Sequence, residues 1–213
     1  MNPKDLKVIF IGDSNTGKTS IAYRLVNDTF NPDQQSTIGS CVFELHVKDG
    51  SGDLNIHLWD TAGQEKFRSL IPNYSRDAKI VLLVYNISDP ESLPRVDQWF
   101  DMLKQTAVNM PKIILIGNKV DIADNTSHED ILSKQKQFAN DMGANDNNYE
   151  NYVAAFSTSA KTGEGINLII QTIRSLSKVK SEVEYKRADQ PKNVKIEEST
   201  STKKRSCCSS SKT

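Results

Sequence analysis

The stretch Val8-Ile-Phe-Ile-Gly-Asp-Ser-Asn-Thr-Gly-Lys-Thr19 joins a short apolar run to a glycine-rich loop, and this junction decides the fold. The four apolar residues Val8–Ile11 predict a strand that is buried on both faces. The loop fits the pattern G-x-x-x-x-G-K-[ST] and runs into a helix-forming segment. Because glycines let main-chain N–H groups point inward at an anion, strand, loop and helix in this order predict a phosphate-binding loop.

Two side chains at the end of this loop carry the chemistry that phosphoryl transfer needs. Lys18 is predicted to neutralise charge on the β- and γ-phosphates and so to contribute to catalysis. The Thr19 hydroxyl is predicted to bind Mg²⁺, and Gly12 and Gly17 are predicted to let the backbone approach the phosphates closely. The loop alone indicates a nucleotide phosphate and leaves the base open.

Further apolar runs at Ile80–Tyr85 and Ile113–Ile116 repeat the pattern of a buried strand. Amphipathic segments between and beyond these runs predict helices near Lys18–Asn27, Ser92–Gln105, Glu129–Met142 and Gly165–Lys178. Strand alternating with helix predicts an α/β fold of the P-loop NTPase class. The expected sheet is six-stranded and mostly parallel, with helices on both faces.

One pair of segments departs from this pattern. Residues 41–47 and 54–59 alternate between apolar and polar side chains, and a glycine-rich turn over residues 49–53 joins them. This pattern predicts an antiparallel hairpin that supplies the one antiparallel edge strand of the sheet. The alternation places Cys41 on the buried face, as a small core residue, and Trp59 on the solvent face.

The base is predicted from two segments that follow later strands. Asn118-Lys119-Val120-Asp121 comes after the buried run Ile113–Ile116, at the edge where open α/β sheets bind ligands. The Asp121 carboxylate would accept hydrogen bonds from N1–H and the exocyclic amine of guanine, a donor pair that adenine lacks. In Ser159-Ala160-Lys161, the Ala160 N–H would donate to guanine O6. The sequence therefore predicts GTP or GDP as the ligand, bound together with Mg²⁺.

A further segment, Trp59-Asp60-Thr-Ala-Gly63-Gln64-Glu65, ends the second strand of the hairpin. Asp60 is predicted to hold Mg²⁺ through water, and Gly63 to let a main-chain N–H approach the γ-phosphate. Gln64 is predicted to orient the attacking water, which makes it a catalytic residue. Thr37, in the loop after the first helix, suits a contact to both Mg²⁺ and the γ-phosphate. The chain supplies no obvious arginine finger, so slow hydrolysis is expected, with both loops released after it.

Two other classes of function are compatible with a phosphate-binding loop. An ATP-dependent kinase or ATPase would need an adenine pocket and a lid for the acceptor, and neither Asp121 nor the Asp60–Gln64 segment suits it. A scaffold that binds nucleotide without turnover is the second alternative. The residues needed for turnover are all present, which disfavours such a scaffold, and product release after one slow turnover would separate the two functions.

These motifs resemble those of the Ras superfamily of small GTPases over residues 6 to 178, and within it those of the Rab family. The segments that carry the Rab resemblance are Thr37-Ile-Gly39, Trp59-Asp-Thr-Ala-Gly-Gln-Glu65, Tyr85-Asn-Ile-Ser88 and Arg68-Ser-Leu-Ile-Pro-Asn-Tyr-Ser-Arg-Asp77. The last of them is most similar to the Rab branch that serves Golgi retrograde traffic. The resemblance implies a G domain over residues 1–178 that acts as a molecular switch in vesicle and membrane traffic.

The resemblance also implies further contacts to the nucleotide. It places Phe30 edge-on against the guanine. It implies that the remaining lining of the pocket comes from Asp13, Ser14, Asn15, Thr16, Ser20, Asn118, Lys119, Ser159 and Lys161.

The partners that the resemblance implies are those of a monomeric switch protein. They are an exchange factor, a GTPase-activating protein that supplies an arginine and its own glutamine, a GDP-dissociation inhibitor or prenylation escort, and effectors that read the two switch loops. Where Rab proteins read I-G-x-D-F, this chain has Ile38-Gly-Ser-Cys-Val42. Of the aromatic triad that Rab partners read, Trp59 and Tyr74 match and Val42 replaces the third member. The choice of effectors therefore stays open.

Composition indicates a reducing compartment and a distinct tail. The chain has 27 basic and 27 acidic residues, which gives no sign of nucleic-acid binding, and three cysteines, two of them adjacent. Its apolar runs are too short for a membrane span or a signal peptide. From Val179 to Thr213 there are nine Lys or Arg against five Asp or Glu, a net charge of +4, and few apolar residues. This composition predicts a flexible tail over residues 179–213.

The tail segment Lys203-Lys-Arg-Ser-Cys-Cys208 looks like a Rab-type double-cysteine prenylation site behind a short basic patch. Prenyl groups on Cys207 and Cys208, together with the basic residues, would anchor the protein stably to a membrane. Five residues follow Cys208, whereas Rab cysteines usually lie within three residues of the end, so redox-labile or palmitoylated cysteines are the alternative. We expect a cytosolic protein that cycles to the cytoplasmic face of a Golgi or vesicle membrane.

Overall fold

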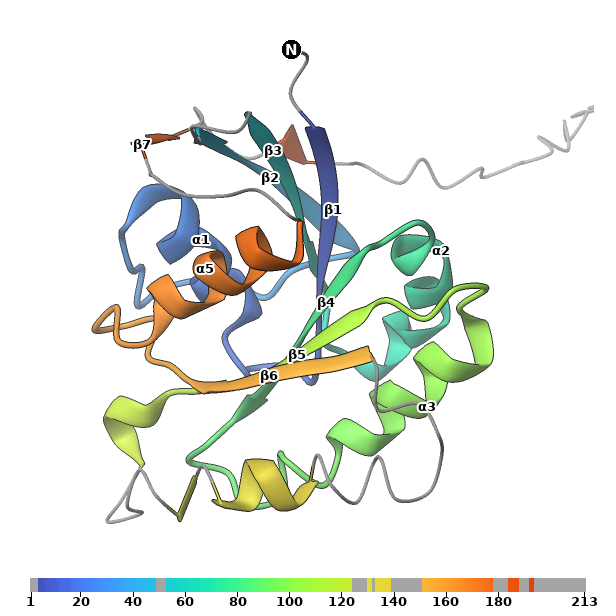
Figure 1. Cartoon of the computed structure of the whole chain (residues 1–213). Coiled ribbons are helices and arrows are strands. Elements are labelled where there is room, and N and C mark those ends of the chain that lie inside the picture. The colour runs from blue at the N-terminus through green and yellow to red at the C-terminus, as the bar shows by residue number, and fades with distance from the viewer. Residues whose placement is uncertain are drawn as a thin grey trace, which may run out of the picture.

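The computed structural model describes residues 4–48, 53–123, 130–131, 133–138, 151–177, 184–187 and 192–193. Within these ranges a single twisted sheet lies between two layers of helices (Figure 1). All six strands that were predicted from the sequence are present. They are β1 (Lys4–Ile11), β2 (Ser40–Lys48), β3 (Leu54–Thr61), β4 (Ile80–Asn86), β5 (Lys112–Asn118) and β6 (Tyr152–Ser157).

The strand order β6-β5-β4-β1-β3-β2 sets where the loops meet. β1 pairs in parallel with β3 and with β4, and β4, β5 and β6 continue the parallel arrangement. β2 runs antiparallel to β3, as predicted for the hairpin, and Cys41 lies opposite Asp60. The carboxyl ends of β1, β3, β4, β5 and β6 therefore lie at the same edge of the sheet, where ligands of open α/β sheets bind.

Two short strands extend the sheet beyond the prediction. β7 (Glu184–Arg187) and β8 (Lys192–Asn193) both pair antiparallel with β2. Neither strand was predicted, because residues 184–193 show no apolar alternation and lie in the part of the chain expected to be a flexible tail. The main-chain groups along the free edge of β2 supply the hydrogen-bonding partners, and this pairing requires no sequence pattern in the added strand.

Each of the four predicted helical segments contains a helix in the structure, but not every helix begins and ends where it was predicted to. α1 (Lys18–Asn27) has the predicted bounds, α5 (Ile166–Leu176) lies within its predicted segment, and residues 130–131 and 133–138 are helical within theirs. α3 (Val96–Thr106) begins at Val96 rather than at Ser92. The Ser92 hydroxyl accepts a hydrogen bond from the Asn86 N–H, which ties residue 92 to the end of β4 instead of to a helix.

Two short helical segments between β3 and β4 were not predicted. They are the 3₁₀ helix η1 (Glu65–Leu70) and the helix α2 (Ile71–Ser75), which directly follows it. η1 buries none of its residues and α2 buries Ile71, so this region has almost none of the apolar periodicity by which a helix is recognised in a sequence.

Burial on both faces of the sheet explains the continuous apolar run of β1. Val8 and Phe10 pack into a core with α1 and α5, whereas Ile9 and Ile11 pack into a second core with α2 and α3. Figure 1 shows α1 and α5 on one side of the sheet and α2 and α3 on the other. Successive side chains of a strand point to opposite faces, so a strand between two helical layers must be apolar throughout.

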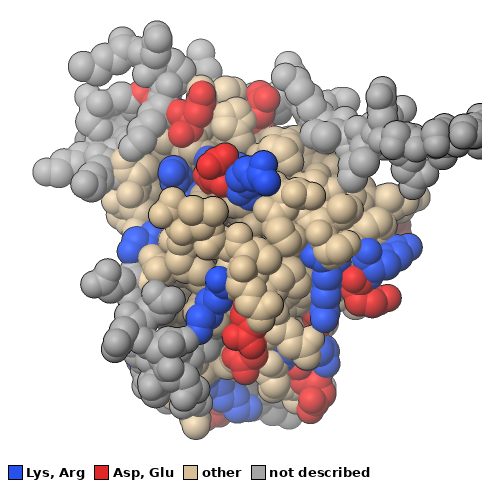
Figure 2. Space-filling view, turned by 90° about the vertical axis from the view of Figure 1, so that its right-hand side faces the viewer, with Lys and Arg blue, Asp and Glu red and all other residues tan. Residues whose placement is uncertain are grey.

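The outer surface of the α2 and α3 layer carries charges of both signs. Figure 2 shows Lys and Arg side chains interspersed with Asp and Glu over this face. No helix in the described part of the chain is both long enough and apolar enough to cross a bilayer.

The packing of α5 against the sheet should contribute a large part of the stability. Ile173 is fully buried on this helix, whereas Leu168 on the same helix is 45% exposed. We predict that Ile173→Ala lowers the free energy of unfolding by about 2–5 kcal/mol, because it leaves a cavity in the core. Leu168→Ala, the matched control, should change it by less than about 1 kcal/mol. Urea unfolding followed by circular dichroism measures both, and equal losses would contradict the assigned packing.

Candidate nucleotide and metal site

Two adjoining cavities lie at the carboxyl edge of the sheet. One of about 230 Å³ is lined by the phosphate-binding loop, the loop after α1 and the end of β3. The other, of about 390 Å³, is lined by Phe30, the segment after β5 and the loop before α5. The two cavities share four lining residues: Asn15, Gly17, Ser20 and Gln34. They are therefore adjacent, and a nucleotide could place its phosphates in the first and its base in the second.

Two glycines of the phosphate-binding loop are required by close contacts. Gly17 has a φ of 90°, and a Cβ at this position would collide with the Asn118 side-chain amide. Gly12 has a φ of 143°, and a Cβ there would collide with the carbonyl oxygen of Val84. Both positions therefore need glycine for the backbone angle and for the space, as the motif predicted.

Lys18 lies buried beneath this loop at the first turn of α1. Its Nζ donates to the main-chain oxygens of Gly12 at 2.8 Å and of Asp13 at 2.7 Å. Burial lowers the pKa of Lys18 to about 8, and the attraction of Asp60 and Asp13 opposes that shift. Within the described residues these bonds use two of its three N–H donors, and Lys18 also lines the first cavity, so a phosphate oxygen there can receive the third.

The three residues predicted to bind Mg²⁺ converge on one point. Thr19 Oγ1 donates to Asp60 Oδ2 at 2.7 Å, Thr37 Oγ1 donates to the same oxygen at 2.9 Å, and the two hydroxyl oxygens lie 2.8 Å apart. Burial raises the pKa of Asp60, while the threonine hydrogen bonds and Lys18 hold it down.

This cluster fits a small divalent cation. Asp60 Oδ1 is buried and has no hydrogen-bond partner in the described part of the chain, so one carboxylate oxygen is left for a further ligand. Two hydroxyls and a carboxylate are the hard oxygen donors that Mg²⁺ prefers, and Mg²⁺ commonly binds through only one or two protein groups, water and substrate phosphates. Bound here, Mg²⁺ would neutralise negative charge on the phosphate oxygens.

Gly63 and Gln64 lie over the phosphate-binding loop, where the second loop leaves β3. A Cβ on residue 63 would collide with the main-chain carbonyl carbon of Asp13 and with Lys18 Nζ, so only glycine allows this approach. Gln64 lines the phosphate cavity, and its carbonyl accepts the Phe67 N–H at 3.0 Å, which caps η1. The position of Gln64 therefore depends on η1, an element that was not predicted.

Asn118 fastens the base side of the site to the phosphate side. Its Nδ2 donates to the Thr16 carbonyl at 2.9 Å, and its Oδ1 accepts the Ala160 N–H at 3.1 Å. The Ala160 N–H was predicted to donate to guanine O6; in the structure it donates to Asn118 Oδ1, and Ala160 lines the base cavity. The reason is that the amide of Asn118 needs an acceptor and a donor on opposite sides, and these two loops provide them.

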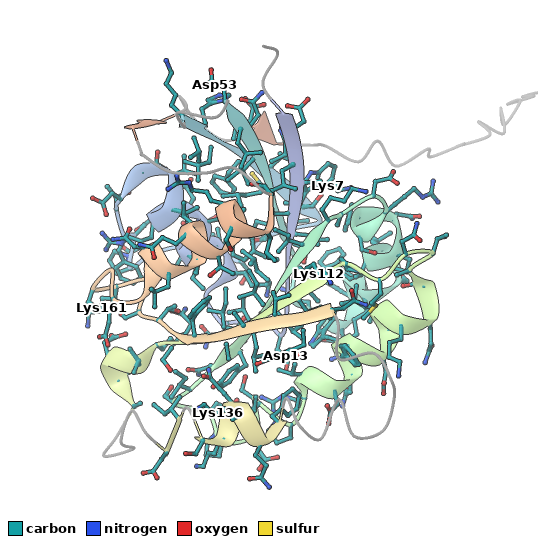
Figure 3. All side chains as sticks on the ribbon, in the orientation of Figure 1. Lys7, Asp13, Asp53, Lys112, Lys136 and Lys161 are labelled. Atoms are coloured by element: carbon teal, nitrogen blue, oxygen red, sulfur yellow. The ribbon has the colours of Figure 1, made fainter. Side chains whose placement is uncertain are left out.

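Asp121 is held at the wall of the base cavity with its carboxylate oriented. Ser159 Oγ donates to Asp121 Oδ1 at 2.6 Å, and Lys161 Nζ lies 3.9 Å from Oδ2. Lys119 Nζ reaches back to Asn15 Oδ1 at 3.2 Å, and burial lowers its pKa, an effect that Asp121 opposes. Figure 3 labels Lys161 in the loop that leads into α5. Phe30, Lys119, Asp121, Ala160 and Lys161 all line this cavity.

The sequence model of the Ras family matches residues 7–178. The chain belongs to the Ras family. Among curated proteins, it is 34% identical to the GTP-binding protein YPT52 of Saccharomyces cerevisiae, over 78% of this chain and 79% of that protein. It is 35% identical to the Ras-related protein Rab-18 of Lymnaea stagnalis, over 79% and 78%, and 31% identical to the GTP-binding protein YPT53 of Saccharomyces cerevisiae, over 79% and 74%.

Membership of this family establishes the general activity of the chain. The chain is a Rab-like small GTPase of the Ras family and hydrolyses GTP. Members of the Ras family bind GTP and GDP with Mg²⁺, and the paired cavities and the Thr19, Thr37 and Asp60 cluster provide a place for both.

Four of the residues assigned to the nucleotide site in this Ras-family chain do not line either cavity. The Asp13 side chain points toward α3, where its carboxylate accepts hydrogen bonds from Arg95 and Trp99. Gly12 and Thr16 contribute main-chain oxygens to Lys18 and Asn118, and Ser159 acts through Asp121. The motif specifies where the backbone of the loop runs and leaves the direction of its polar side chains to the surrounding helices.

The cavities also include residues that were not predicted. They lie mainly in the loop after α1 and are Asn31, Pro32, Gln34, Gln35, Ser36, Thr61 and Ile122. Phe30 and Thr37 were both predicted contacts, so the segment between them could have been inferred to cross the site. Cys207 and Cys208 lie outside the described residues.

The buried Lys18 gives nucleotide binding a pH dependence. A phosphate binds the protonated amine, and with a pKa of about 8 this form declines as the pH rises past that value. We predict that the affinity for GDP falls about fourfold between about pH 7 and about pH 8.5, as the protonated fraction does. Lys18→Ala should bind more weakly, with an affinity that is flat over this range. Isothermal titration calorimetry at each pH measures both, and an unchanged affinity of the wild-type protein would contradict the assignment.

Proposed function

We propose that this Rab-like GTPase acts as a nucleotide-dependent switch in vesicle and membrane traffic, at the site described above. The observation that carries the proposal is the meeting of Thr37, from the loop after α1, with Thr19 and Asp60 at 2.8 Å and 2.9 Å. A metal and a γ-phosphate at this point would tie that loop to the phosphate-binding loop. After hydrolysis the tie is lost, and the surface offered to partners changes.

The chain's own groups support slow hydrolysis. Lys18 and the main-chain N–H groups of the loop hold the phosphates, and Gln64 at the wall of the same cavity orients the attacking water. Neither cavity is lined by an arginine from the described residues. A catalytic arginine therefore has to come from a GTPase-activating protein, which for the related Ras accelerates hydrolysis about 10⁵-fold.

Guanine selection is assigned to Asp121. Ser159 donates to one carboxylate oxygen of Asp121, and Asp121 lines the cavity that Phe30 and Lys119 also line. The guanine N1–H and exocyclic amine would donate to this carboxylate, whereas adenine would leave it unpaired.

The partner surface is assigned to the two loops and the hairpin beside them. Ile38 is 83% exposed next to Thr37, and the rings of Trp59 and Tyr74 lie 6.3 Å apart at a tilt of 37°. Cys41 and Val42 are half-buried on β2, so the altered segment changes this surface without opening the core. We assign the binding of the exchange factor, the activating protein, the dissociation inhibitor and the effectors to this face. We propose that the membrane is that of the Golgi, because residues 68–77 are similar to the Rab branch that serves Golgi retrograde traffic.

Replacement of Gln64 tests the catalytic assignment. We predict that Gln64→Leu lowers the single-turnover rate of GTP hydrolysis by about tenfold or more while GDP binding is retained, because leucine cannot orient water. Gln105→Leu, an exposed glutamine on α3, is the matched control and should hydrolyse GTP as the wild-type protein does. Equal rates for Gln64→Leu and the wild-type protein would rule out the catalytic role of Gln64 in intrinsic hydrolysis.

The tail assignment is tested separately. We propose that Cys207 and Cys208 are prenylated and that residues 179–213 tether the G domain of residues 1–178 to the membrane. Replacing both cysteines by serine should release the protein from a membrane fraction, and replacing Ser209 and Ser210 by alanine should not. Mass spectrometry of the native C-terminal peptide should show two added prenyl groups. Free thiols or palmitate there would refute prenylation, and a membrane pool away from Golgi markers would refute the compartment.

A further inference from the structure

The Asp13 carboxylate is the meeting point of three elements. Its Oδ2 accepts a hydrogen bond from Arg95 Nε at 2.6 Å, and its Oδ1 accepts one from Trp99 Nε1 at 2.8 Å. Arg68 Nη2, from η1, lies 3.5 Å from the same Oδ1. Figure 3 labels Asp13 below the central strands. The phosphate-binding loop is thus joined to α3 and to η1 through one side chain.

The two arginines are themselves oriented by other contacts. Arg95 Nη2 donates to Asp89 Oδ2 at 2.6 Å, so Arg95 bridges two carboxylates. Arg68 Nη1 donates to Gln98 Oε1 at 3.0 Å, and its guanidinium lies over the Trp99 ring at 4.7 Å from the centroid. Charge-assisted bonds of this kind are stronger than neutral ones, and the Asp13 side chain is only 19% exposed, which limits screening by solvent.

Arg68 is close in sequence to Gln64 and lies on the helix that Gln64 caps. The Gln64 carbonyl accepts the Phe67 N–H, and η1 then runs from Glu65 to Leu70. η1 buries none of its residues, so it has no apolar anchor of its own. Its polar anchor within the described residues is the Arg68 side chain on Asp13, Gln98 and Trp99.

We propose that Asp13 is a positioning residue for GTP hydrolysis, which through Arg68 fixes η1 and hence the place of Gln64. This inference rests on the proposed role of Gln64. Arg68 lines neither nucleotide cavity, so its loss should act on the rate of hydrolysis and leave nucleotide binding nearly unchanged. A displacement of about 1 Å in a water-orienting group costs up to about 100-fold in rate, so loss of this anchor should slow hydrolysis measurably.

The experiment compares the wild-type protein with Asp13→Ala, Arg68→Ala and the double variant. Single-turnover hydrolysis of GTP and dissociation of fluorescent GDP are measured on each. We expect each single variant to hydrolyse GTP about tenfold more slowly, the double variant to be no slower than the single ones, and GDP dissociation from Arg68→Ala to stay within about twofold of the wild-type rate. Lys66→Ala is the matched control. Lys66 is an exposed cation on the same helix, and its ammonium lies over the Phe67 ring. It should hydrolyse GTP at the wild-type rate.

Two further variants separate positioning from loss of structure. Arg68→Lys keeps a cation within reach of Asp13 and should recover most of the lost rate. In a Gln64→Leu background, Arg68→Ala should cause no additional loss, because the group that it positions is gone. Arg68 is partly exposed, so its variants fold even if Asp13→Ala does not, and the comparison of alanine with lysine at position 68 then decides the proposal.

The results that would contradict the role of Asp13 differ from those that would contradict the proposed function. An unchanged hydrolysis rate in Arg68→Ala, or a double variant that is about 100-fold slower because the two losses multiply, would overturn the coupling. Faster GDP dissociation from Arg68→Ala, in step with slower hydrolysis, would make the Arg68 and Asp13 pair a structural part of the binding site. If the wild-type protein fails to bind or hydrolyse GTP, the proposed function itself is wrong.

Discussion

The buried carboxylate of Asp60 is the constraint around which the site is arranged. A carboxylate without access to water has to be paired or hydrogen-bonded, because leaving it alone costs several kcal/mol, on the order of what holds a domain together. Its partners come from two parts of the chain: Lys18 and Thr19 at the start of α1, and Thr37 in the loop that follows. The end of β3 is therefore bound to the phosphate-binding loop and to the first switch loop at one atom, Oδ2. The other oxygen, Oδ1, has no hydrogen-bond partner within the described residues, so it is available to a cation.

A second set of contacts joins the segments that line the base cavity to the phosphate-binding loop. Asn118 bridges the Thr16 carbonyl and the Ala160 N–H, so the end of β5, the phosphate-binding loop and the loop before α5 are joined into one unit. Gly17 passes so close to Asn118 that a side chain there would break the bridge. Asp13 extends the same unit outward to α3 and η1. The Thr37 loop contacts Thr19 of this unit, and Asp60, through the Thr37 side chain, whereas Gln64 is joined to η1 by the main-chain hydrogen bond from the Phe67 N–H.

The sequence was informative wherever burial or backbone geometry dictates the residue type. Continuous apolar runs identified the strands because both faces of this sheet are covered, and the glycine positions identified the phosphate loop because no other residue fits there. Side-chain directions were less predictable. Asp13 was expected in the pocket, and its side chain instead faces Arg95, a partner 82 residues away in sequence. The weakly apolar η1 and α2, and the short strands β7 and β8, carry no periodic pattern, since tertiary contacts rather than local sequence determine them.

The most direct test of the account is a competition experiment with fluorescent GDP bound to the purified protein, in the presence of Mg²⁺ and after its chelation. GTP should displace the probe with high affinity, ATP should fail to do so, and chelation of Mg²⁺ should accelerate release of the probe. That result is expected from the carboxylate of Asp121 at the base and from the Thr19, Thr37 and Asp60 cluster at the phosphates. Displacement by ATP, or release that is indifferent to Mg²⁺, would contradict the assignment of these residues.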